Sequence, residues 1–194
     1  MRRRTLDALL TTGGLVLAAL LLVSGGLLSW AHAFISDQVS TQLSAQQIFF
    51  PPKGPATASP EIGPFINQYA GQQLKTGDQA RAFADHFIAV HLKESGGGLT
   101  YSQLSAKSRA NPTDIKLADS VNTAFKGETL RGLLLNAYAF AKMGQIALIA
   151  AVVSFIGAGV MLLLSLLGFV HLRRVSPEEE VLAGHARQRE SITV

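Results

Sequence analysis

The chain has 194 residues, so at roughly 150 residues per domain it holds about one folded domain. Of these residues 48% are hydrophobic and only 15% charged, with a formal net charge of +4 and a mean hydropathy of +0.27; soluble domains average about 25% charged residues, so the composition excludes an ordinary soluble domain. The chain has no cysteine, which excludes a disulfide scaffold, a thiolate zinc site, an iron–sulfur cluster and a cysteine nucleophile.

Two long uncharged runs predict two membrane spans. No Asp, Glu, Lys or Arg occurs from Ala8 to Ser36 or from Met143 to Leu172. Each run exceeds the roughly 20 residues that cross about 30 Å of hydrocarbon. We therefore predict transmembrane helices at residues 9–34 and 143–172.

The basic residues beside these runs predict the orientation. Arg2, Arg3 and Arg4 precede the first span, and Arg173 and Arg174 follow the second. By the positive-inside rule both termini, residues 1–8 and 173–194, are cytoplasmic in the cell (plasma) membrane. Topology and anionic lipid explain the excess positive charge, so nucleic acid is not an expected partner.

A cleaved signal peptide is the alternative interpretation of the first span. The arginines would form its n-region, and Ala31-His32-Ala33 fits the pattern that precedes a cleavage site. The apolar run is longer than the roughly 7–15 residues of a signal h-region, which favours a retained anchor. Cleavage after Ala33 stays open at this point.

The apolar cores of the spans contain small residues at helical spacing and no ionisable residue. A carrier or pump acting alone is therefore not expected. Small residues four apart allow two helix backbones to approach closely, either within a hairpin or against another subunit. The candidate packing positions are Gly14 and Ala18 in the first span, and Ala150, Ser154 and Ala158 in the second, with Ala147 and Ala151 beside them.

Residues 35–142, between the spans, predict a small, mainly helical extracytoplasmic domain. A short apolar strand or extended segment around 47–50 precedes a Pro/Gly-rich linker at 51–60. A short helix is expected at 64–74, and Asp78 is expected to be the N-cap of the next helix. The apolar arc of that helix comprises Ala80, Phe83, Ala84, Phe87, Ile88 and Val90, and Gly96-Gly97-Gly98 ends it.

The remaining segments also predict helices. A brief helix is expected from Tyr101 to Lys107. Another begins at Thr113 and, because no proline interrupts it, runs on into the second span. In the tail, Ser176-Pro177 followed by three glutamates predicts a short surface helix.

The sequence gives no motif for catalysis, and no cofactor or metal is expected. His86 and His91 are five apart, which does not suit chelation from one regular helix. His91 falls in the apolar arc and is expected to be a hydrogen-bonded core histidine. Phe83, Phe87, His91 and Tyr101 are the candidate core or pocket of the outer domain.

The middle of the chain resembles a known family. The runs TGDQARAFADHFIAVHLKESGGGLTYSQLS and FKGETLRGLLLNAYAF, the latter leading into a span, are similar to small, uncharacterised two-span membrane proteins of actinobacteria. Some members carry the label of an aromatic ring-opening dioxygenase subunit, which this sequence does not support. The resemblance implies the same location and topology, with a recurrent His91, glycine turn and Thr100-Tyr101 segment, and supplies no catalytic residues.

Together these patterns predict an all-α membrane protein: a two-helix transmembrane hairpin with a small extracytoplasmic helical domain. The expected function is that of a non-catalytic accessory or scaffolding subunit of a membrane or cell-envelope assembly. Its expected partners are the lipid bilayer and another membrane protein or a second copy of itself. The alternative is an extracytoplasmic ligand sensor coupled to the second span.

Overall fold

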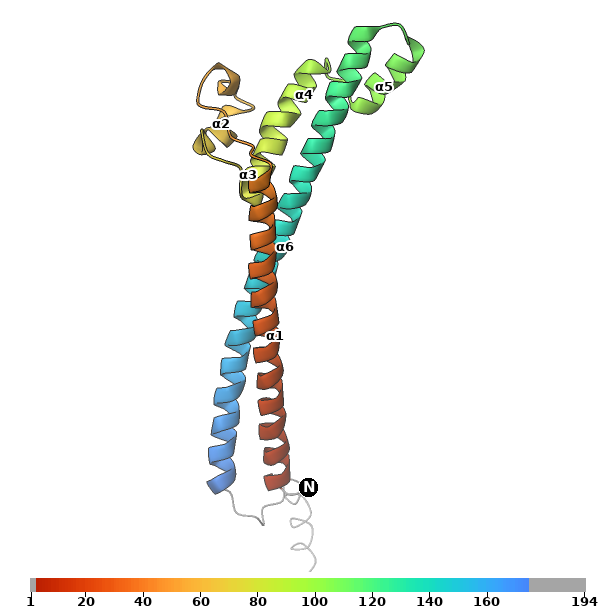
Figure 1. Ribbon diagram of the computed structural model, residues 1–194. Coiled ribbons are helices and arrows are strands. Elements are labelled where there is room, and N and C mark those ends of the chain that lie inside the picture. Colours follow the sequence, from red (N-terminus) through yellow and green to blue (C-terminus); the bar gives the residue numbers. More distant parts are fainter. Residues whose placement is uncertain (1–2, 175–194) are drawn as a thin grey trace, which may run out of the picture. The chain divides into compact units, whose positions relative to one another are not determined.

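A computed structural model describes the backbone of residues 3–174, and every named element within that range is a helix (Figure 1). The predicted tail helix at Ser176 lies outside the described residues. Two helices, α1 (Arg3–Ala45) and α6 (Ile115–Arg174), contain segments long and apolar enough to cross a membrane, judged by length and composition. This confirms the all-helical class and the two candidate spans.

The chain divides into two compact units. The first combines residues 1–30 with 147–194, and the second comprises residues 31–146. In the second unit, α3 and α4 run beside the first part of α6, and α5 lies next to the first turns of α6 (Figure 1). The elements of this unit between the two long helices are η1 (Pro55–Thr57), α2 (Gly63–Ile66), η2 (Asn67–Tyr69), α3 (Gly77–Ala82), η3 (Phe83–Ile88), α4 (Ala89–Ser95) and α5 (Tyr101–Ala110).

The helix predicted at 64–74 is wrong in its second half. Helical structure ends at Tyr69, and Gly71 follows with a φ of +73°, a left-handed conformation that favours glycine. The chain then extends and pairs with the segment after α1, where Phe50 N–H donates to Gln72 O at 2.9 Å and Leu74 N–H donates to Ile48 O at 2.8 Å. The strand expected near 47–50 is thus a single isolated bridge, Phe49 to Gln73.

The Pro/Gly-rich segment 51–60 contains the 3-10 turn η1, and its Thr57 is 1% exposed. Gly63 lies so close to this turn that an added Cβ would come within 2.6 Å of Thr57 O. The segment is therefore packed against the start of α2.

The N-cap of α3 is Thr76, so the prediction of Asp78 was wrong. Gln79 N–H donates to Thr76 Oγ1 at 3.2 Å, and Gln79 Oε1 accepts from Thr76 N–H at 3.1 Å. This reciprocal capping box satisfies two backbone donors, whereas Asp78 lies in the first turn, where its charge suits the helix dipole. Thr100 and Gln103 cap α5 in the same way.

A π-helix, η3, joins α3 to α4, and a π-turn holds about one residue more than an α-turn, so the regular helical wheel used for the prediction does not apply across it. Phe83, Ala84, Ile88 and Val90 are buried, as the apolar arc predicts. His91 is exposed, and its Nδ1 lies 2.7 Å from Phe87 O. The prediction of a core histidine is therefore wrong, and His91 is a surface histidine. The helix ends at Ser95, as the following glycines predict.

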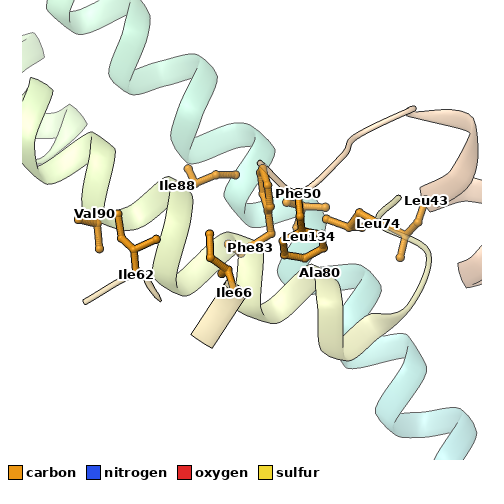
Figure 2. Packing of buried hydrophobic residues seen from close by; sticks show 11 residues of the cluster. Leu43, Phe50, Ile62, Ile66, Leu74, Ala80, Phe83, Ile88, Val90 and Leu134 are labelled. Atoms are coloured by element: carbon orange, nitrogen blue, oxygen red, sulfur yellow. The ribbon is translucent and has the colours of Figure 1, made fainter. Parts of the chain in front are cut away.

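The core of the second unit joins α1, the loop after it, η3 and α6. Figure 2 shows Phe50, Phe83 and Leu134 at its centre, with Leu43 and Leu74 toward one end and Ile62 and Val90 toward the other. Phe50 is 2% exposed and meets Phe83 edge-on, with ring centroids 5.3 Å apart. Burying an aromatic side chain of this kind stabilises a fold by about 3–5 kcal/mol relative to alanine. This core fixes the small helices to α6.

Candidate functional site

The four candidate residues of the predicted helical domain separate into two places within the second unit. Phe83 is 7% exposed and belongs to the core, Phe87 contacts it at a centroid distance of 4.9 Å, and His91 contacts Phe87 at 4.4 Å. Tyr101 packs instead on Phe125 of α6, at 5.6 Å. Tyr101 also lines a recess of about 150 Å³ with Leu92, Leu99 and Ala124, among others. The first three residues therefore form a row from the core to the surface, and Tyr101 is not part of it.

A polar recess forms where three segments of the second unit meet. Its volume is about 270 Å³. One wall is α1, another is the loop leading into α3, and the third is α6. The lining residues are His32, Ser36, Val39 and Ser40 from α1, Lys75, Thr76, Gly77 and Asp78 from the loop and α3, and Ala141, Gly144 and Gln145 from α6.

His32 is held in this recess by the opposite helix. Its Nδ1 lies 2.8 Å from Gly144 O. A carbonyl oxygen only accepts, so Nδ1 carries the hydrogen, and Nε2 is the ring nitrogen that remains for other partners. An added Cβ on Gly144 would lie 3.1 Å from Ile35 Cγ2, so glycine permits this close approach of the two helices.

Two residue pairs clamp the start of α3 to α6. Lys142 Nζ lies 3.0 Å from Asp78 Oδ1, and within α6 it also donates to Gln145 Oε1 at 2.9 Å. Arg81 donates to Tyr138 Oη at 2.8 Å, and its guanidinium lies 4.9 Å from the centre of that ring. Between them, Gly77 approaches α6 so closely that an added Cβ would collide with the Ala141 side chain. The loop cannot leave α6 without breaking both residue pairs.

An ion-pair network continues the clamp along α6. Arg131 Nη2 donates to Asp85 Oδ1 at 3.2 Å, and Arg81 lies 3.6 Å from the other oxygen of the same carboxylate. Arg131 also pairs with Glu128 at 3.5 Å. Arg131 Nε is buried with no hydrogen-bond partner. The π-helix η3 thus carries Asp85, the residue that joins both arginines.

An apolar groove lies along α1 and α6 in the same unit. Its volume is about 410 Å³, and its walls are mostly apolar with two amides. The lining residues are Phe34, Ile35, Gln38, Val39, Gln42, Ala137 and Phe140. Phe34 and Phe140 lie within a turn or so of the ends of the two uncharged runs, where aromatic side chains gather at membrane interfaces.

In the first unit the two long helices pack antiparallel through small residues. Gly14 faces Ser165, Gly25 faces Phe155, and Gly168 faces Thr11, each too closely to admit a Cβ without movement. The buried positions recur every seven residues, which is the repeat of a left-handed coiled coil. The recurring positions are Thr11, Ala18 and Gly25 on α1, and Ala151, Ala158 and Ser165 on α6, and Gly14 is buried between the first two.

The predicted packing residues therefore agree only in part with this small-residue seam. Gly14, Ala18, Ala151 and Ala158 lie in the seam. Ala150 and Ser154 are half-buried beside it, and Ser154 Oγ donates to Ala150 O at 2.8 Å. The four-residue spacing used for the prediction follows one ridge of a single helix, whereas two helices that pack over several turns repeat their contacts every seven residues.

A second recess, of about 280 Å³, opens at one end of the seam. Asp7 Oδ2 lies 3.9 Å from His171 Nε2 there and has no hydrogen-bond partner. Thr11 and Ser165 also line it. Within residues 5–174, no group of three or more His, Asp or Glu side chains is arranged to hold a metal ion.

Sequence reasoning missed the polar recess, because its walls come from segments up to about 110 residues apart and no local motif connects them. One local signal is present in the sequence: the T-x-x-Q capping box at Thr76 and Gln79, which marks where the loop ends and α3 begins. No family model matches the chain, and neither a curated protein nor a solved structure matches it.

Proposed function

We propose that this is an integral membrane protein with two spans, both termini in the cytoplasm and residues 35–142 outside. We further propose that it is a non-catalytic accessory or scaffolding subunit of a membrane or cell-envelope assembly. The resemblance to the two-span actinobacterial family agrees with this location. The proposal draws its main support from the apolar groove between α1 and α6.

The groove has the features of a seat for a partner's helix. Phe34, Gln38 and Gln42 recur every four residues along α1, so the groove is aligned with the helix axis. An amphipathic or transmembrane helix inserts its apolar side chains into a groove of this kind. The two amides offer hydrogen bonds across a helix–helix contact, which lipid chains do not provide.

The test is whether a partner protein copurifies with the chain, and whether a substitution that fills the groove prevents this. Full-length protein tagged at the C-terminus is extracted from its native membrane in mild detergent, and the mass and composition of the complex are determined. We expect a stoichiometric membrane-protein partner that is lost with Gln38→Trp, which fills the groove, and kept with Thr41→Trp. Thr41 is an equally exposed position on α1 that does not line the groove. Recovery of the unmodified chain as a monomer contradicts the proposal.

The polar recess favours a second candidate function, an extracytoplasmic sensor. The recess is bounded by both long helices and by the clamp, so a molecule bound in it would contact α3 and α6 together. Such a ligand would raise the unfolding temperature of the purified chain, because it binds only the folded form. A screen of small polar compounds by thermal unfolding, with Asp78→Ala as the comparison variant, measures this effect. If no compound raises the unfolding temperature in an Asp78-dependent way, the sensor function is excluded.

A further inference from the structure

The polar recess lies at the ends of the two uncharged runs. The uncharged run of α1 ends at Ser36, before Asp37, and that of α6 begins at Met143, after Lys142. The recess residues of α1 (32–40) and of α6 (141–145) straddle both ends. If the uncharged runs cross the hydrocarbon, as proposed above, the recess opens at the level of lipid headgroups.

The lining of the recess is rich in hydrogen-bond donors. Ser36 and Ser40 present hydroxyl groups one helical turn apart on α1, and Lys75 contributes an ammonium group. Hydroxyl and ammonium groups are the side chains that bind phosphate oxygens. The donors come from two segments, α1 and the loop before α3, whose separation is fixed by the packing of that loop on α6.

The charges of the recess also favour an anion. Its one carboxylate, Asp78, is paired with Lys142 at 3.0 Å, which neutralises it. Lys75 has no ion-pair partner among residues 5–174, so a positive charge remains uncompensated there. The net charge of these three groups is positive by one.

The size of the recess limits the occupant. Pockets for whole small molecules are typically about 300–1,000 Å³, and this one is about 270 Å³. A single tetrahedral group with its ordered water fits such a volume, while the rest of the molecule extends outside it.

From this depth, chemistry, charge and size we propose that the recess binds a phosphate group, carried by a phospholipid of the outer leaflet. Ser36, Ser40 and Lys75 donate to its oxygens. The lipid source rests on the membrane topology proposed above; soluble phosphate presents the same chemistry and is distinguished by the experiment.

The experiment measures lipid binding to the full-length protein by native mass spectrometry in a neutral detergent. The probes are phosphatidylglycerol, phosphatidylcholine and a galactosyl diacylglycerol, which has the same chains and no phosphate. We expect both phospholipids to be retained over the galactolipid. Lys75→Gln should weaken phosphatidylglycerol binding about five-fold, as expected for one lysine at a membrane surface. The uncharged change Ser36→Ala with Ser40→Ala should weaken both phospholipids.

Lys53→Gln is the matched control, because this substitution removes the same charge from an exposed lysine that does not line the recess. An equal loss with Lys53→Gln, or no preference over the galactolipid, overturns the site. A Lys75-dependent rise in unfolding temperature with millimolar sodium phosphate over sodium chloride at equal ionic strength, without lipid retention, overturns the lipid source. None of these outcomes depends on a protein partner, so they are separate from failure of the copurification.

Discussion

At the scale of single residues, glycines and polar contacts decide where the small helices of the second unit lie. Gly77 lets the loop before α3 touch α6, and Gly144 lets His32 reach across to a carbonyl. These roles could not be predicted, because the sequence around a glycine does not show whether another segment of the chain packs against it. The end of α4 at Ser95 was predictable, because its cause is local: the following Gly97 and Gly98 adopt φ values of +59° and +76°.

The close approach at Gly77 gives a prediction for stability. An added methyl group at this position meets the Ala141 side chain, so Gly77→Ala should lower the free energy of unfolding by about 1–3 kcal/mol. The matched control is Gly132→Ala in α6, where an added Cβ has nothing within 4 Å and a helical alanine should stabilise by about 0.5–1 kcal/mol. Denaturant unfolding in detergent, followed by circular dichroism, measures both. Equal effects of the two changes would show that the loop does not rest on α6.

At the scale of elements, the sequence predicted those features that depend on residues close together in the chain. The two apolar runs, the unbroken course of α6 and the helix at Tyr101 all follow from hydropathy and the lack of proline. The sequence did not predict the π-helix at Phe83–Ile88, because the contacts of its side chains, Phe83 in the core and Asp85 with Arg131, involve residues far away in the chain. The end of helical structure at Tyr69 was missed for a similar reason: a distant segment, Ile48–Phe50, competes for the backbone of Gln72–Leu74.

The small-residue seam gives a prediction at this scale. Ala158 is fully buried against α1, so Ala158→Leu should force the helices apart and destabilise their packing by about 1–3 kcal/mol. The neighbouring Gly159→Leu adds more side chain at a position where a Cβ has nothing within 4 Å, and it should leave the packing unchanged. Titration of the protein with a denaturing detergent, monitored by helix content, compares the two. A larger effect of Gly159→Leu would place the interface on the other face of α6.

At the scale of the whole molecule, composition predicted the class and left the function open. An all-helical chain with two candidate spans follows from hydropathy alone, and the structure agrees. The recess, the clamp and the groove depend on residues 32–42 meeting residues 75–81 and 137–145, and such long-range pairing has no signal in one sequence. Topology is therefore the property that most needs direct measurement.

The natural absence of cysteine makes that measurement direct. A single cysteine at Ala106, exposed on α5, should react with a membrane-impermeant maleimide in intact cells. One at Thr5 should react only after the membrane is opened, because the N-terminus is proposed to be cytoplasmic. The reverse pattern would invert the topology. The intact mass of the purified chain adds a second readout, since cleavage after Ala33 would remove α1 as far as the recess.

The wide turn at Phe83–Ile88 has one further consequence, for chain length. A π-turn accommodates about one residue more than an α-turn, so this site can lose a single residue and close into an ordinary helix without a break. The shortened chain would keep α3 and α4 continuous, and the later side chains of α4 would stay on their present faces, because the wide turn already takes up the extra residue. His91 would remain on the surface, where it lies now. Related chains of different length are therefore expected to differ by one residue at this turn, with the packing of α4 unchanged.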